Sequence, residues 1–213
     1  MTVEWVTLDC YGTLIDWERG VTDALLPLIP GADRGQLARR YIEVEADAEA
    51  GEYESYRDVL ARAGGALLRE HGIDAPSPLA ASLPSWPPFP EVPAALRALR
   101  QRGLRLAILS NVDRDLLTES VRALGVTPDL AVTAQDCGSY KPAPGHWMRF
   151  QRESGADNGA TLHVGASQYH DMRPAAALGY RTCFVDRHKE PLVTAPTLVL
   201  PDLSGLPEAV AGM

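Results

Sequence analysis

Short apolar segments alternate with amphipathic ones along most of this chain, and this alternation constrains the fold more than any other feature. The apolar segments fall at residues 5–8, 104–109, 130–133, 161–164, 181–185 and 197–200. Helical periodicity covers residues 92–102, 114–124, 144–154 and 171–178. Strands that alternate with helices in this way form a parallel sheet with helices on both faces. We therefore predict an α/β fold with a doubly wound, Rossmann-like parallel sheet.

A long helical segment separates the first predicted strand from the others. Three stretches have the apolar spacing of a helix: residues 17–29, 34–50 and 54–71. A proline-rich connection then runs from Ala75 to Pro93, and proline marks loops and ends helices. We predict a core domain formed by residues 1–15 and 89–213, and a helical domain formed by residues 16–88 and inserted after the first strand.

The second helical stretch carries an apolar stripe formed by Tyr41, Val44 and Ala48. Residues at this spacing lie on one face of a helix. The stripe fits two arrangements. It packs inside the helical domain as part of its own core, or it pairs with a second copy of the chain in a homodimer.

Composition and charge exclude several classes of protein. A net charge of −8 argues against non-specific nucleic-acid binding, which needs a basic surface, although a local pocket can still bind a small anion. Three scattered cysteines, Cys10, Cys137 and Cys183, are typical of a reducing compartment. The sequence has neither an apolar run long enough to span a membrane nor a basic leader followed by an apolar stretch. We expect a cytoplasmic protein with no membrane partner.

Polar clusters follow four of the predicted strands. They are Asp9 to Thr13, Ser110-Asn111, Ser139 to Pro142 and Gly165 to Asp171. Ligands of open α/β sheets bind at the carboxyl ends of the strands, so we expect these clusters to form one site. A carboxylate such as Asp9 can act there as a nucleophile, and a fixed cation such as Lys141 would offset its charge.

In this order the clusters resemble the four motifs of the haloacid dehalogenase superfamily, over nearly the whole chain, with the inserted helices as the cap domain of that family. The resemblance implies that Asp9 is the catalytic nucleophile and that Thr13 orients it. It implies that Lys141 neutralises the charge of the nucleophile. Asp171 matches the late carboxylate of the fourth motif, which orients Lys141 or helps to activate water.

The same resemblance implies a set of substrate-binding residues. Ser110 and Asn111 match the second motif, whose hydroxyl and amide bind the anionic group of the substrate. Ser167 stands in the fourth motif as a further hydroxyl. Tyr11 would form part of an apolar wall that desolvates the nucleophile. Arg40 lies in the cap region from which this family supplies an arginine for the substrate, although a basic side chain there can equally belong to a solvated helix face.

Two departures from the superfamily pattern decide which branch the chain resembles most. Most members are phosphatases and carry a second Asp where this chain has Tyr11, and a Gly-Asp pair where it has Gly165-Ala166. The 2-haloacid dehalogenases carry Tyr at the first of these positions. A halide leaves as a stable anion and needs no proton donor. The resemblance therefore implies a hydrolase that forms a covalent ester on Asp9, acts on a small 2-haloalkanoic acid and uses no metal or other cofactor.

Two other functions stay open. A magnesium-dependent phosphatase that acts on a small phosphorylated metabolite would bind Mg²⁺ through Asp9 and Asp171, with one carboxylate fewer than usual because of Ala166. A catalytically weak protein would bind a small anion or a protein partner.

A run of acidic residues follows Arg40 in the predicted cap, from Glu43 to Glu54. We expect these side chains to form a solvated helix face. If Glu43 or Asp47 instead pointed inward, the substrate would not be a simple anion.

Overall fold

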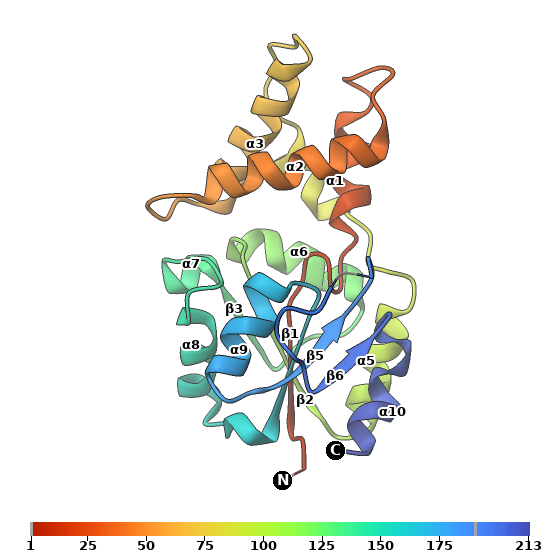
Figure 1. Cartoon of the computed structure of the whole chain (residues 1–213), viewed down its shortest axis with the longest axis vertical. Coiled ribbons are helices and arrows are strands. Elements are labelled where there is room, and N and C mark those ends of the chain that lie inside the picture. The colour runs from red at the N-terminus through yellow and green to blue at the C-terminus, as the bar shows by residue number, and fades with distance from the viewer. Residues whose placement is uncertain (1, 190) are drawn as a thin grey trace.

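The computed structural model describes residues 2–189 and 191–213, and a single parallel sheet forms its centre (Figure 1). The strand order is β3-β2-β1-β4-β5-β6, and each neighbouring pair is parallel. The strands are β1 (Trp5–Leu8), β2 (Arg105–Ser110), β3 (Leu130–Thr133), β4 (Thr161–Gly165), β5 (Arg181–Val185) and β6 (Leu198–Leu200). This topology confirms the predicted doubly wound α/β fold.

Helices cover both faces of the sheet, as the buried strands require. The core helices are α5 (Val92–Gln101), α6 (Arg114–Leu124), α7 (Ala134–Cys137), α8 (Gly145–Ser154), α9 (Arg173–Ala177) and α10 (Leu206–Ala211). Side chains of α5, α6 and α10 pack in one apolar cluster, and side chains of α8 and α9 pack in a second. Every residue of β1 and of β4 is buried, which is typical of a parallel sheet enclosed between two helical layers.

The strand order reverses direction at β1, whose neighbours are β2 and β4. Asp9, Ser110 and Gly165 stand at or directly after the ends of these three strands. Ligands of doubly wound folds bind at such a switch point. The topology therefore brings three of the four polar clusters to one edge of the sheet.

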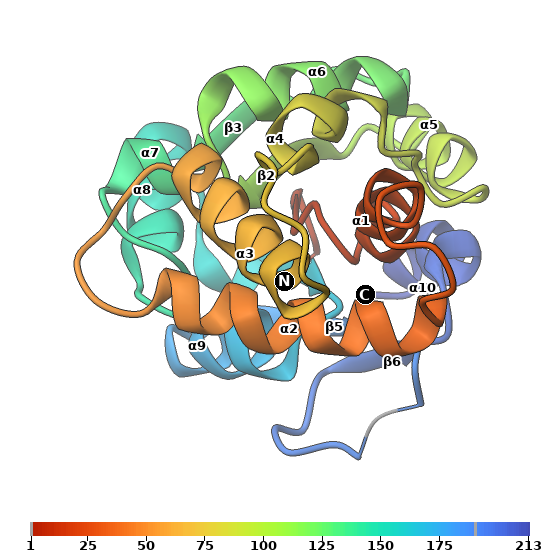
Figure 2. The same cartoon turned by 90° about the horizontal axis from the view of Figure 1, so that it is seen from above.

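Residues 16–88 form a helical insertion that covers this edge (Figures 1 and 2). Its helices are α1 (Trp17–Leu25), α2 (Arg34–Glu49), α3 (Tyr56–Glu70) and α4 (Leu79–Ser82). The side chains of Asp16, Asp33 and Ser55 accept hydrogen bonds from the first turns of α1, α2 and α3, which is what these residue types do at a helix N-cap. That residues 16–88 form a separate domain stays a prediction.

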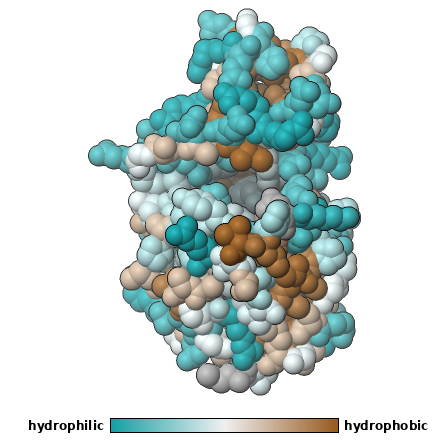
Figure 3. Space-filling model, viewed as in Figure 1, coloured by the Kyte–Doolittle hydropathy of each residue, from teal (hydrophilic) through white to brown (hydrophobic). Residues whose placement is uncertain are grey.

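The apolar stripe of α2 packs inside the chain. Tyr41 and Val44 are buried in the main apolar cluster, and Ala48 packs against it. Of the two arrangements that the sequence allowed, the stripe therefore forms the core of the insertion and offers no surface for a second copy. The insertion is mostly hydrophilic on the face seen in Figure 3.

Two helices differ by more than two residues from their predicted bounds, in each case for a local reason. The helix predicted over residues 17–29 ends at Leu25, because Pro27 follows closely and cannot continue the hydrogen-bond pattern. The helix predicted over residues 171–178 is instead a π-helical turn over Gln168–Met172 followed by α9. Such turns absorb one extra residue and are frequent at functional sites.

One carboxylate of the core holds the insertion in place. Asp113 precedes α6 but does not cap it. Its two oxygens instead accept hydrogen bonds from the backbone N–H groups of Tyr56 and Arg57, at 3.1 and 2.9 Å. These are first-turn donors of α3, which carry no partner within their own helix. Asp113 therefore caps a helix of the insertion from the core.

We expect the substitution Asp113→Ala to lower the free energy of unfolding by about 1–2 kcal/mol, because two N–H groups of α3 lose their acceptor. Denaturant unfolding monitored by circular dichroism measures the change. The matched control is Asp115→Ala on the same helix, which removes an exposed ion pair with Arg57 and should change stability little. An equal loss in both variants would contradict the assignment of Asp113 as a cap of α3.

Candidate active site

The ammonium group of Lys141 lies at the centre of the candidate site and connects two carboxylates. Its Nζ atom donates to Asp9 Oδ1 at 2.8 Å, to Asp171 Oδ1 at 2.7 Å and to the backbone carbonyl of Leu109 at 2.9 Å. All three of its protons are therefore used, and the lysine is almost completely buried. The structure thus brings together three of the four residues predicted to be catalytic.

Thr13 holds the second oxygen of the Asp9 carboxylate. Its hydroxyl donates to Asp9 Oδ2 at 2.6 Å and accepts from the backbone N–H of Ala166 at 2.9 Å. Gly12 lies between them with a φ of +94°, a backbone conformation that glycine adopts without strain. The turn after β1 therefore orients the carboxylate and links it to the end of β4.

Burial and the neighbouring charges shift the pKa values of these groups in opposite directions. Burial raises the pKa of Asp9, and the charge of Lys141 offsets this only in part. Burial would also raise the pKa of Asp171, but Lys141 and His163 hold it well below its usual range. Burial would lower the pKa of Lys141, yet the two carboxylates raise it above its usual value. The lysine therefore stays charged, and Asp171 stays ionised.

The π-helical turn presents Asp171 to the lysine from a tightly packed position. A Cβ atom at Gly165 would lie 2.6 Å from the side chain of Asp171, so only glycine fits at the end of β4. Below Asp171, His163 Nε2 is 3.3 Å from Asp171 Oδ1, and His163 Nδ1 is 2.9 Å from Thr7 Oγ1. Asp171 is thus fixed from both sides.

Ser110 and Asn111 lie close to the lysine but differ in what they contact. The Oγ atom of Ser110 is buried and has no hydrogen-bond partner among the described residues. Asn111 accepts from the backbone N–H of Lys141 at 2.6 Å and donates to its carbonyl at 3.1 Å. Its amide therefore holds the lysine loop, which the sequence did not indicate.

The hydroxyl of Tyr11 is engaged with a side chain of α6. It lies 2.9 Å from Ser120 Oγ. The Tyr11 ring is stacked on the Tyr56 ring and meets the Trp86 ring edge-on. Tyr11 is therefore part of an aromatic wall between core and insertion. Ser167 caps the π-helical turn by accepting from the backbone N–H of His170 at 3.0 Å.

Arg40 does not line the site. Its guanidinium is exposed and pairs with Glu43 and Glu70 on the outer face of the insertion. The structure places Arg40 on the outer face because α2 turns Tyr41 rather than Arg40 inward. Glu43 and Asp47 are exposed as expected, but Glu45 and Glu49 are partly enclosed, so the acidic run is not uniformly solvated.

Sequence reasoning also missed Arg187. Its guanidinium donates to the carbonyls of Gly12 and Thr13 at 3.2 and 2.8 Å, pairs with Glu91 at 2.8 Å, and lies over the Phe89 ring. It thereby holds the turn that carries the nucleophile. The residue lies in the loop after β5, and no local pattern marks it.

The two carboxylates do not fit a divalent cation in the arrangement observed. Asp9 Oδ1 and Asp171 Oδ1 both contact Lys141 Nζ, so an ammonium occupies the position between them. Ala166 supplies no side-chain oxygen, and no three His, Cys, Asp or Glu side chains of the described residues gather in a metal-binding arrangement. Magnesium prefers several hard oxygen ligands.

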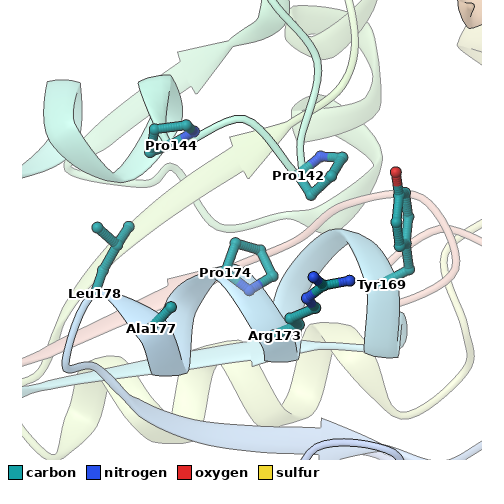
Figure 4. A pocket seen from close by; sticks show the side chains of 7 residues that line it. All are labelled: Pro142, Pro144, Tyr169, Arg173, Pro174, Ala177 and Leu178. Atoms are coloured by element: carbon teal, nitrogen blue, oxygen red, sulfur yellow. The ribbon is translucent and has the colours of Figure 1, made fainter.

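A surface pocket lies outside this site (Figure 4). It has a volume of about 390 Å³ and lies between the loop after Lys141 and α9. It is lined by Pro142, Pro144, Tyr169, Arg173, Pro174, Ala177 and Leu178. None of these is a carboxylate or a nucleophile, so the chemistry belongs to the cluster around Lys141. Among the described residues, no helix is long and apolar enough to cross a membrane.

Comparisons with known proteins agree with this geometry. A family model described as haloacid dehalogenase-like hydrolase matches residues 3–179. Haloacetate dehalogenase H-2 of Moraxella sp. (strain B) is 28% identical over 222 residues, which cover 98% of each chain. The L-2-haloacid dehalogenase of Xanthobacter autotrophicus has a similar structure, with a TM-score of 0.89 at 22% identity over 100% of both chains. A structure of that enzyme with chloropropionic acid covalently bound matches with a TM-score of 0.88 at 21% identity, also over 100% of both chains. The chain therefore belongs to the haloacid dehalogenase-like hydrolase family and is a hydrolase.

Proposed function

We propose that this enzyme removes halide from a small 2-haloalkanoic acid through an ester formed on Asp9. A carboxylate oxygen of Asp9 attacks the carbon that bears the halogen, the new C–O bond forms, and the halide leaves with the electron pair of the C–X bond. Water then attacks the ester carbonyl, which releases the 2-hydroxy acid and regenerates the carboxylate. The similarity to a haloacetate dehalogenase along the whole chain supports this assignment.

The observation that carries the proposal is the position of the Tyr11 hydroxyl. It is engaged with Ser120, so the second position after the nucleophile provides no acid for an alkoxide leaving group. A halide needs none. The covalent chloropropionic acid complex of the Xanthobacter autotrophicus enzyme supports the same route.

The neighbouring groups have distinct roles in this proposal. Lys141 lowers the repulsion between the Asp9 carboxylate and the substrate carboxylate. The free Oγ of Ser110 binds the substrate carboxylate. Asp171, ionised and next to Lys141, accepts a proton from the water that hydrolyses the ester. None of these steps needs a metal.

A magnesium-dependent phosphatase fits less well, because Lys141 lies between the two carboxylates that would hold the ion. A pure binding protein fits less well too. A buried carboxylate with both oxygens oriented by Thr13 and Lys141 is arranged for attack rather than for holding an anion.

We expect purified enzyme to release chloride from 2-chloropropionate in the presence of a chelator. The variant Asp9→Asn should lose this activity by about three orders of magnitude or more, because the amide is a poor nucleophile. Halide release measured by ion chromatography checks both.

The conservative variant Asp47→Asn, at an exposed position of α2, serves as the control. Its rate of chloride release should match that of the parent enzyme. Phosphate release from small phosphoesters that appears only with added magnesium would overturn the proposal. Chloride release that survives in Asp9→Asn would overturn the assignment of the nucleophile.

A further inference from the structure

The pocket of Figure 4 lies between two segments that each continue directly from the central charge cluster. One wall is the loop that holds Pro142 and Pro144, and Pro142 directly follows Lys141. The other wall begins in the π-helical turn that carries Asp171 and continues along α9. Lys141 Nζ donates to Asp171 Oδ1 at 2.7 Å, so a buried hydrogen bond joins the two segments inside the protein.

One face of α9 and its C-cap supplies most of the lining. Arg173, Pro174, Ala177 and Leu178 follow the spacing that places residues on one side of a helix. Figure 4 shows their side chains on one side of the pocket and the two prolines of the loop on the other. Proline has a fixed φ and a closed ring, so these walls lose little conformational freedom when a ligand binds.

The pocket has a polar end and an apolar end. Arg173 and Tyr169 lie near Pro142 at one end, and Ala177 and Leu178 lie at the other (Figure 4). Its volume of about 390 Å³ is in the range of small-molecule sites, which have mostly apolar walls and a few polar groups. A lining whose polarity changes from end to end favours a ligand with a polar head and an apolar body.

The guanidinium of Arg173 has no ion-pair or hydrogen-bond partner in the part of the chain that the structure describes. Arg149 on the neighbouring α8, in contrast, pairs with Asp136 and Glu153. Carboxylates outnumber cations in this chain, whose net charge is −8, yet none of the described ones reaches Arg173. A guanidinium binds a planar carboxylate through paired hydrogen bonds. The charge of the pocket is therefore complementary to an external carboxylate.

We propose that this pocket binds a small amphipathic monocarboxylate. The carboxylate pairs with Arg173, and an apolar group of about the size of a phenyl ring packs against Pro174, Ala177 and Leu178. The pocket is separate from the site around Asp9, so binding there does not depend on the reaction proposed above. A ligand in this position contacts both segments that carry the charge cluster and reinforces the packing between them.

Calorimetry on the full chain with three probes tests whether both ends of the pocket contribute. We expect phenylacetate to bind at least about fivefold more tightly than 2-phenylethanol, which has the same ring but no charge. Acetate has the charge but no ring and should bind more weakly than phenylacetate, because it leaves the apolar end empty. Equal affinity for phenylacetate and 2-phenylethanol would overturn the role of the guanidinium.

Two pairs of variants test the named residues. Arg173→Gln should weaken phenylacetate binding at least about fivefold, whereas Arg152→Gln, at an exposed position of α8 outside the pocket, should leave it unchanged. Ala177→Phe fills the apolar end and should abolish binding. Ala176→Phe makes the same change at the neighbouring exposed position of α9, which does not line the pocket, and should retain binding. Unchanged affinity in Arg173→Gln and Ala177→Phe would overturn the site.

Nuclear magnetic resonance of the alanine methyl groups locates the ligand. Phenylacetate should shift the Ala177 methyl resonance and leave that of Ala166 in place, because the N–H of Ala166 donates to Thr13 in the site around Asp9. A shift at Ala166 without one at Ala177 would place the ligand in that site and overturn the inference. These measurements need no turnover, so a failure of chloride release would remove the proposed reaction and leave the pocket supported.

Discussion

The substitution Lys141→Met should abolish turnover and destabilise the fold at neutral pH. The lysine satisfies two buried carboxylates and one buried carbonyl. Removing one partner of a buried ion cluster leaves uncompensated charge, which costs about 3–5 kcal/mol. Loss of a preorganised charge at the reacting group lowers kcat by about 10²–10³-fold or more. Denaturant unfolding and chloride release measure the two effects.

The pH dependence of this variant has a definite sign. In the parent enzyme, Lys141 keeps the pKa of Asp171 low, so Asp171 contributes stability that is present at neutral pH and lost as the pH falls through its folded pKa. Without the lysine, burial raises the pKa of both carboxylates, and the penalty at neutral pH is relieved as they protonate. The stability difference between variant and parent should therefore shrink from pH 7 to pH 5.

Lys189→Met is the matched control, since Lys189 is the second of the two lysines in the chain and is exposed. It should keep both activity and stability. A Lys141→Met variant as stable as the parent at pH 7 would contradict the charge arrangement described above.

The substitution Gly165→Ala should lower kcat/KM by about 100-fold while adding a single methyl group. The new Cβ atom would lie 2.6 Å from Asp171, so the carboxylate or the π-helical turn has to move. A displacement of about 1 Å in a catalytic arrangement costs on the order of 10²-fold in rate. Overpacking of a buried position also destabilises by about 1–3 kcal/mol.

Two comparisons isolate this effect. Gly35→Ala makes the same chemical change at an exposed position of α2, where the nearest atoms lie 3.4 Å or more away, and it should be silent. In an Asp171→Gly background the obstructing atoms are gone, so Gly165→Ala should destabilise much less than in the parent. An additive loss in the double variant would show that the methyl group acts through another contact.

Most of the core followed from local patterns in the sequence. Apolar strands, glycine-bounded turns and polar strand ends are short-range features, and parallel strands necessarily place those ends at one edge. The clustering of Asp9, Thr13, Lys141 and Asp171 could therefore be predicted, and the structure brings them together. Their catalytic roles stay a prediction.

The sequence by itself thus determined the α/β fold and the central charge cluster, whereas tertiary packing decided what surrounds that cluster. The rotation of α2 turned Tyr41 and Glu45 inward and Arg40 outward. The cap that Asp113 provides to α3 joins residues that are separated by 56 or 57 positions in the sequence. Helical periodicity states which residues share a face, but not which neighbour that face meets. That choice depends on long-range packing of the insertion against the core, which no local pattern records.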